Sequence, residues 1–275
     1  TLLSRIFYGG GAGGLGEALA GFALAYAMRP LGAIVFGHVG DRYGRRLTML
    51  LSMSMMTVAM LATALLPTYA QIGPAAGWML LALRCLMAFS VGGEYTGVVA
   101  YLMEGARARR RGFVASLASA ASEIGALLAA GVAAATVALM DDASLAEWGW
   151  RIPFFVGAGM AGLVLLARST MEESPDFLRQ QAQSRVPRNP LRQSLTRHRL
   201  PILRGFAISA LGSITYYVGI TYVPSFLTGT GAMAEVAALW LSTAAALVVI
   251  LVTPFTGLLA DRIGRRPALL SLGMA

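Results

Sequence analysis

The sequence predicts an all-α protein that crosses a membrane several times, and two observations carry this prediction. Hydrophobic residues make up 57% of the 275 residues and charged residues only 13%, whereas a soluble domain is about a quarter charged. The apolar residues gather in stretches of about 20 or more, the length that a helix needs to cross the hydrocarbon core. Runs of this kind are helices, because an unpaired strand leaves its backbone hydrogen bonds unsatisfied in lipid.

Seven complete spans and the beginning of an eighth are expected along the chain. Their limits are 16–37, 47–66, 76–102, 112–139, 150–167, 201–227 and 236–257, and the eighth begins at Pro267. The polar loops between the spans set these limits. Basic loops follow the first, third and seventh spans, acidic residues follow the fourth, and a long polar stretch follows the fifth. Trp148 and Trp150 stand where the fifth span begins, a position typical of aromatic residues at the membrane surface.

The charged loops alternate between the two sides of the predicted membrane. All 22 positive charges are arginines, and all but four of them lie in the loops on one side or within a few residues of these loops. The opposite loops carry Arg5 and the acidic residues Asp141, Asp142, Glu147 and Glu235. Because cytoplasmic loops carry an excess of basic residues, the arginine-rich side is predicted to face the cytoplasm of a multi-pass protein in the inner (plasma) membrane. The net charge of +9 therefore does not indicate a nucleic-acid partner.

One ten-residue pattern, Gly-x-x-x-Asp-Arg-x-Gly-Arg-Arg, occurs twice, in loops 37–46 and 257–266. The first copy consists of Gly37, Asp41, Arg42, Gly44, Arg45 and Arg46, and the second of Gly257, Asp261, Arg262, Gly264, Arg265 and Arg266. Each copy follows a helix that runs toward the arginine-rich side, so the two halves are parallel repeats related by an axis along the membrane normal. The glycines allow tight turns and close helix approach, and each aspartate can pair with an arginine or meet the positive N-terminus of a helix. We expect these two gate loops to hold one face of the protein closed during a conformational change.

The repeat divides the chain into three parts. Residues 1–167 are predicted to form the first membrane half, 168–200 a linker, and 201–275 the start of the second membrane half. The linker is polar, rich in arginine and broken by three prolines, and is interpreted as a solvated connection on the cytoplasmic side. Docking of the linker to anionic lipid headgroups is the alternative.

Further motifs accompany the repeat: Arg29-Pro30-Leu31-Gly32, the run Ser-Val-Gly-Gly-Glu-Tyr at 90–95, Glu104 with Arg111-Gly112-Phe113, residues 148–155, and Glu173-Ser174-Pro175. Together with the gate loops they resemble the metabolite:proton symporter branch of the major facilitator superfamily, which includes proline/betaine, citrate and α-ketoglutarate transporters. The resemblance implies the major facilitator fold of two parallel six-helix halves. The first span here corresponds to the family's second helix, and twelve spans need roughly 400 residues, so the chain is expected to lack the first helix and most of the last four.

Four ionisable side chains lie well inside the predicted spans, away from their ends: Arg29, Arg84, Glu94 and Glu123. A charge within the bilayer is costly, so each of them marks a candidate functional site. Glu94 and Glu123 are candidates for proton coupling. Glu94 can alternatively form a structural ion pair with Arg29, which lies at a similar depth, and Glu123 can alternatively accept a hydrogen bond from Ser119. The glycines at 92, 93 and 97 around Glu94 are expected to let another helix approach closely.

Two arginines and two tyrosines are candidates for substrate binding. Arg84 resembles the fourth-helix arginine of the superfamily, although the Gln and Gly that follow it in the family are absent here. Arg84 and Arg29 can each pair with a substrate carboxylate. Tyr216 and Tyr217 in the sixth span can hydrogen-bond a carboxylate or cover a quaternary ammonium, with ordinary packing as the alternative.

The resemblance implies a secondary active transporter that imports a small organic acid or zwitterion together with protons by alternating access. An exporter or antiporter is the alternative within transport, and a non-transporting membrane sensor on the same scaffold is the alternative outside it. The antiporter signature needs a Gly-Pro pair on the family's fifth helix, and span 112–139 contains no proline. The sequence shows no nucleophile–base constellation, metal-ligand set or phosphate-binding loop, so neither an enzyme nor a cofactor or metal is expected. The expected partners are a small-molecule substrate, protons and the lipid bilayer around a monomer.

Overall fold

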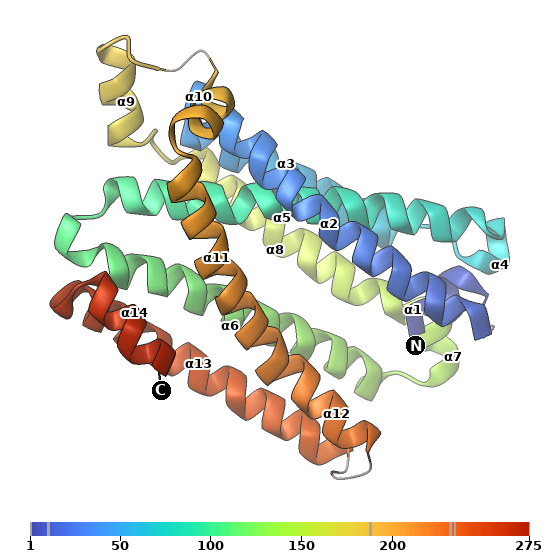
Figure 1. The fold of residues 1–275 in the computed structure, drawn as a ribbon. Coiled ribbons are helices and arrows are strands. Elements are labelled where there is room, and N and C mark those ends of the chain that lie inside the picture. Colours follow the sequence, from blue (N-terminus) through green and yellow to red (C-terminus); the bar gives the residue numbers. More distant parts are fainter. Residues whose placement is uncertain (1, 10–11, 187–188, 231–232, 234, 275) are drawn as a thin grey trace. The chain divides into compact units, whose positions relative to one another are not determined.

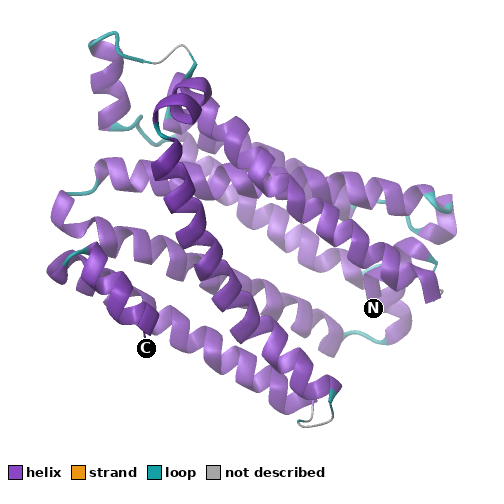
Figure 2. Ribbon diagram, in the orientation of Figure 1, coloured by secondary structure: helices purple, strands orange, loops and turns teal. Residues whose placement is uncertain are grey.

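A computed structural model describes residues 2–9, 12–186, 189–230, 233 and 235–274. Within these residues the regular structure is entirely helical, and they contain no strand (Figure 2). The all-α class predicted from the sequence is confirmed. A long apolar run forms a helix in lipid, because a helix satisfies its backbone hydrogen bonds within itself.

Six stretches of the described helices are long and apolar enough to cross a membrane. They are Ala20–Tyr43, Arg45–Ala64, Ala75–Gly105, Ala108–Leu139, Gly149–Ser169 and Trp240–Ile263. They belong to α2 (Ala12–Tyr43), α3 (Arg45–Ala64), α5 (Ala75–Gly105), α6 (Arg111–Leu139), α8 (Ile152–Ser169) and α13 (Glu235–Ile263). Each of the six matches one of the seven complete spans expected from the sequence.

The remaining expected span, 201–227, is helical throughout but is not one of these six stretches. It consists of α11 (Arg199–Tyr216), a π-helical segment η3 (Tyr217–Tyr222) and α12 (Val223–Gly229). The π-helical turns divide the run, and α11 is diluted by Arg204 and several Gly and Ser residues. A membrane crossing by this run stays a prediction.

Short helices connect or flank the long ones. They are α1 (Leu2–Tyr8), α4 (Tyr69–Ile72), η1 (Ala108–Arg110), α7 (Asp142–Glu147), η2 (Gly149–Arg151), α9 (Pro175–Ala182), α10 (Pro190–Arg197) and α14 (Arg265–Met274). Two of them have side-chain caps that the sequence supplies. Ser174 accepts a hydrogen bond from the Phe177 amide at the start of α9, and Asp141 accepts one from the Ser144 amide at the start of α7. The Ser144 amide, donating to the carboxylate, holds the pKa of Asp141 below its ordinary value.

The chain divides into two compact units. The first contains Thr1–Gly105 and Ala129–Pro190, and the second contains Ala106–Leu128 and Leu191–Ala275, so α6 contributes to both. In the first unit α2, α3, α5 and α8 lie side by side (Figure 1). In the second unit, η3 contacts α12 and α13. The division into two membrane halves and the linker 168–200 stays a prediction.

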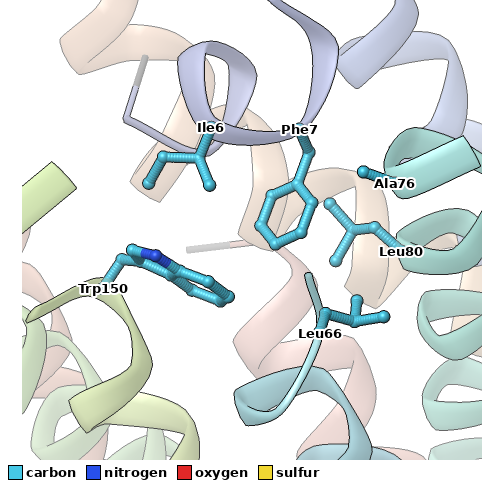
Figure 3. Packing of buried hydrophobic residues seen from close by; sticks show 6 residues of the cluster. All are labelled: Ile6, Phe7, Leu66, Ala76, Leu80 and Trp150. Carbon is cyan, nitrogen blue, oxygen red and sulfur yellow. The ribbon is translucent and has the colours of Figure 1, made fainter. Parts of the chain in front are cut away.

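A small apolar core lies in the first unit, where residues of α1, α5 and η2 come together (Figure 3). It is formed by Ile6, Phe7, Leu66, Ala76, Leu80 and Trp150. The ring of Phe7 meets the ring of Trp150 edge to face, with the centroids 4.9 Å apart. Trp148 is exposed, whereas Trp150 is buried, so packing against α1 rather than contact with the membrane surface accounts for Trp150.

Glycines bring α2 and α5 into close contact. A Cβ atom on Gly92 would overlap the backbone carbonyl of Arg29, and one on Gly32 would overlap the carbonyl of Phe89. The close approach expected from the glycines around Glu94 is thereby confirmed at Gly92. It is not found at Gly97, where the nearest atom, of Met49, would lie 3.5 Å away in ordinary contact.

Candidate functional site

The carboxylate of Glu94 joins three helices of the first unit. Glu94 projects from α5 and forms an ion pair with Arg168 at the end of α8. Ser52 of α3 donates a hydrogen bond to the other carboxylate oxygen, Oε2, at 2.9 Å. The Glu94 side chain is 21% exposed and that of Arg168 is 16% exposed, so water does little to screen this pair.

The alternative considered for Glu94, an ion pair with Arg29, is wrong, because the carboxylate pairs with Arg168. The backbone carbonyl of Arg29, not its side chain, faces α5 at Gly92. The guanidinium instead lies over the ring of Tyr26, with its carbon 4.5 Å from the ring centroid, and its Nε has no hydrogen-bond partner among the described residues. Sequence reasoning missed Arg168 because it was counted with the linker, although it stands at the inner end of the fifth span.

Arg84 lies on the same helix as Glu94 but apart from it. It stands ten residues earlier, which corresponds to about 15 Å along the helix axis. Its side chain is half-buried and forms no hydrogen bond or ion pair with the side chains that the structure describes. Arg84 and Glu94 are therefore two separate features of α5.

The second unit brings Glu123 and Tyr216 together. The Tyr216 hydroxyl at the end of α11 donates a hydrogen bond to Oε2 of Glu123 on α6 at 2.9 Å, across 93 residues of sequence. The ring of Tyr217 meets that of Tyr216 edge to face, with the centroids 5.5 Å apart. From the sequence these residues were candidates for two different roles, and Ser119 was the partner considered for the carboxyl. The structure places a proton-coupling candidate and a substrate-binding candidate in direct contact.

The first gate loop is held by a network around Arg45. Gly44, with a φ of 105°, ends α2 and starts α3 in a conformation that is essentially restricted to glycine. The Arg45 guanidinium forms ion pairs with Asp41 at 2.7 Å and with Glu104 of α5 at 2.9 Å. Its Nε also donates to Glu104 at 3.0 Å. One guanidinium thus ties the loop to the end of α5.

A second carboxylate, that of Glu173, caps the N-terminus of α3. Its Oε1 accepts hydrogen bonds from the backbone amides of Arg45 at 2.8 Å and Arg46 at 3.2 Å. The Arg46 side chain in turn donates to the carbonyl of Ser169 at 2.6 Å. A negative charge at this position also complements the helix dipole. The sequence marked Glu173 only as part of a family motif, because the helix it caps begins 128 residues earlier.

In the second gate loop the aspartate of the repeat is itself the cap. Asp261, near the end of α13, accepts hydrogen bonds from the amides of Gly112 at 2.8 Å and Phe113 at 2.9 Å, in the first turn of α6. A Cβ atom on Gly112 would lie 2.7 Å from the carbonyl of Gly257, so the two backbones meet at glycines. Gly264, with a φ of 94°, makes the turn into α14. Both roles considered for the repeated aspartates occur, one in each copy.

The other residues of the repeat have simpler surroundings. Nothing lies within 4 Å of a Cβ atom built on Gly37, so the expectation that this glycine permits a close helix approach is wrong. The guanidinium of Arg42 lies 5.4 Å from the ring centroid of Tyr43. Arginines of the second copy are exposed: Arg262, Arg265 and Arg266.

Residues 17–194 match the sequence profile of the family described as sugar (and other) transporters. The chain is 38% identical over 252 residues to the α-ketoglutarate permease of Escherichia coli, covering 92% of this chain and 57% of the permease. It is 34% identical over 261 residues to the proline/betaine transporter of Salmonella typhimurium, covering 91% and 52%. The chain therefore spans about half the length of these curated relatives.

Solved structures show the same fold. The structure of the proton:xylose symporter XylE bound to 6-bromo-6-deoxy-D-glucose matches with a TM-score of 0.77 and 20% identity, covering 97% of this chain and 65% of XylE. A partially occluded, inward-open structure of XylE from E. coli matches with a TM-score of 0.58 over the same share of this chain. At this identity the likeness is one of fold alone.

Proposed function

Because this chain belongs to the sugar (and other) transporter family of the major facilitator superfamily, we propose that the full-length protein is a proton-coupled symporter. Its substrate class is a small organic acid or a zwitterion, resembling α-ketoglutarate or citrate on one side and proline or betaine on the other. The observation that carries the proposal is a pair of glutamates held inside apolar helices, Glu94 and Glu123, in a chain with such relatives. An ionisable group inside a membrane span costs free energy, so each such group is a candidate functional site, and proton movement is one such function.

Arginines within the spans support the substrate class. Arg84 and Arg29 are not neutralised by any described carboxylate, and one guanidinium group placed in this way can receive the carboxylate of a substrate. The Tyr216 and Tyr217 rings add a hydroxyl donor and aromatic faces that suit either a carboxylate or a quaternary ammonium. These arginines and tyrosines suit the binding of a transported substrate rather than the catalysis of a reaction.

Movement between two faces of the membrane is assigned to the gate loops. Each loop takes part in a contact between a carboxylate and the backbone amides at a helix N-terminus. Glu173 accepts from the start of α3, where the first loop ends, and Asp261 of the second loop accepts from the start of α6. Such contacts can form and break without a change in the helices themselves. The arginine-rich loops and the linker 168–200 face the cytoplasm in this proposal. The protein acts as a monomer in the inner membrane, with the halves 1–167 and 201–275 rocking about a site near the midplane.

Uptake by the full-length protein in lipid vesicles tests the proposal. Labelled α-ketoglutarate, citrate, proline and glycine betaine are offered with and without an inward proton gradient. At least one of them is expected to accumulate against its own gradient, and a protonophore is expected to abolish the accumulation. Uptake that is the same with and without the proton gradient for all four substrates would contradict proton coupling.

A further inference from the structure

The two glutamates inside the membrane spans have different electrostatic partners. Glu94 is paired with the guanidinium of Arg168, so the pair carries no net charge when both groups are ionised. Glu123 is hydrogen-bonded to the neutral hydroxyl of Tyr216, and it forms no ion pair with any described arginine. A proton added to Glu94 would leave Arg168 as an uncompensated charge, whereas a proton added to Glu123 removes the only charge of its pair.

Depth in the membrane does not separate the two candidates. Glu123 stands 12 residues after the start of α6, about 18 Å along its axis, and Glu94 stands 11 residues before the end of α5, about 16 Å along its axis. Half of the hydrocarbon core is about 15 Å, so both carboxyls lie near the midplane of their helices. The difference lies in the partner, not in the position.

The hydroxyl of Tyr216 can serve either state of the Glu123 carboxyl. It donates to the carboxylate, and after a proton has bound to a carboxyl oxygen the same hydroxyl can accept from the acid or still donate to its carbonyl oxygen. The proton comes from water, converts the carboxylate to the acid, and leaves again to water when the carboxyl is next ionised. Tyr216 keeps its own proton throughout.

Tyr216 is also the residue at which α11 changes into the π-helical segment η3. Short π-helical segments are rare and occur frequently at functional sites. A change in the hydrogen bond between Glu123 and Tyr216 therefore acts at the residue where the α-helix ends and the π-helical segment begins. The segment η3 in turn contacts α12 and α13. The contact couples the charge of a carboxyl on α6 to the backbone of the helical run that consists of α11, η3 and α12.

From this arrangement we infer that Glu123 binds the coupled proton, that Tyr216 is its positioning residue, and that Glu94 with Arg168 is a structural ion pair. The inference rests on the proposed proton coupling and names its site. The titratable groups on the facing element are Tyr216, bonded to Glu123, and Tyr217, packed against Tyr216. The charged residues of α13 stand at the two ends of that helix, at 235, 261 and 262.

Infrared difference spectroscopy of the purified full-length protein, recorded as the pH is changed, detects the carbonyl stretch of a carboxylic acid without any substrate. Wild type is expected to show a titrating acid band that Glu123→Gln removes. Tyr216→Phe should keep the band but shift its frequency and its midpoint pH, because the hydrogen bond is lost. The control replaces Glu94→Gln together with Arg168→Gln, which removes a carboxyl while leaving no unpaired charge, and it should keep the band unchanged.

Loss of the band in the Glu94/Arg168 double variant, or its persistence in Glu123→Gln, would overturn the inference. If Glu123→Gln does not fold, Tyr216→Phe decides, since an unshifted band in that variant refutes the contact. The readout needs no transport, so it separates a wrong proton site from a wrong function. In vesicles, Glu123→Gln is expected to lose gradient-driven accumulation and to retain exchange of substrate between the two sides.

Discussion

A single methyl group added to Gly44 is expected to disrupt the first gate loop. Gly44 combines a φ of 105° with a ψ of 157°, and a Cβ atom there would overlap Oε2 of Glu173 and lie 3.2 Å from the ring of Phe177. The backbone conformation alone costs a non-glycine residue about 1–3 kcal/mol. Displacement of Glu173 from the start of α3 removes a helix cap worth about 0.5–2 kcal/mol. Gly44→Ala should therefore destabilise the protein by about 2–4 kcal/mol.

Two further glycines of the repeat separate these contributions. Gly264 has a φ of 94° but its Cβ would meet only Pro267, at 3.7 Å, so Gly264→Ala should cost the backbone strain alone, about 1–2 kcal/mol. Gly37 has no atom within 4 Å of its Cβ and lies inside α2, so Gly37→Ala should be neutral or stabilise by up to about 1 kcal/mol. From the most to the least stable, the expected order is Gly37→Ala, wild type, Gly264→Ala and Gly44→Ala.

Thermal unfolding of the full-length protein in detergent, at one scan rate for all variants, measures this order. At about 2–4 °C per kcal/mol, Gly44→Ala should lower the midpoint by about 4–16 °C. In a Glu173→Ala background the added cost of Gly44→Ala should fall by about 1–2 kcal/mol, because no cap is left to displace. The reasoning is refuted if Gly44→Ala costs no more than Gly264→Ala, or if its cost is unchanged without Glu173.

Three further experiments, which use five substitutions, test the remaining contacts. Asp261→Asn removes a charge that accepts hydrogen bonds from two backbone amides and should destabilise by about 1–2 kcal/mol in the same unfolding assay. Asp41→Asn should cost less than about 1 kcal/mol, because the Asp41 side chain is 40% exposed in its ion pair with Arg45. Equal effects of the two substitutions would contradict the assigned cap. Gly92→Ala should prevent correct packing of α2 on α5, seen as loss of the monodisperse protein on size-exclusion chromatography, and normal yield would argue against the close backbone contact. Arg168→Gln should destabilise the protein by somewhat less than the roughly 3–5 kcal/mol expected when a fully buried pair is broken. Adding Glu94→Gln to that variant should restore part of the lost stability, because it removes the unpaired carboxylate. No restoration would show that the two residues do not interact.

The helical class and most of the membrane stretches were predictable from the sequence alone. Six of seven expected complete spans agree with the structure to within a few residues at most ends, because a stretch of apolar residues between charged loops is a local signal. The seventh, 201–227, shows the limit of that signal. Its helical state was predictable, but the π-helical turns at 217–222, which contact α12 and α13, have no signal in the apolar pattern.

In the gate loops, the glycine turns were predictable from the repeated motif, whereas the residues that the loops contact were not. A glycine at 44 and at 264 indicated tight turns, and both have a positive φ. The cap on α3, in contrast, comes from Glu173, which lies four predicted spans further along the chain, and no spacing in the sequence relates the two. The six residues that the two copies share thus acquire different contacts, because the surroundings of the two loops differ.

The sequence by itself determined that this protein is helical, crosses a membrane repeatedly, contains a duplicated loop and carries a few charged residues at membrane depth. In a bilayer these properties follow from short segments of sequence, because each apolar stretch and each charged loop takes its place in the membrane according to its own residues. The tertiary structure alone decided the partner of each buried charge: Arg168 rather than Arg29 for Glu94, and Tyr216 for Glu123. Such partners depend on which faces of distant helices meet, and that is set by close contacts such as the one between Gly92 and the Arg29 carbonyl.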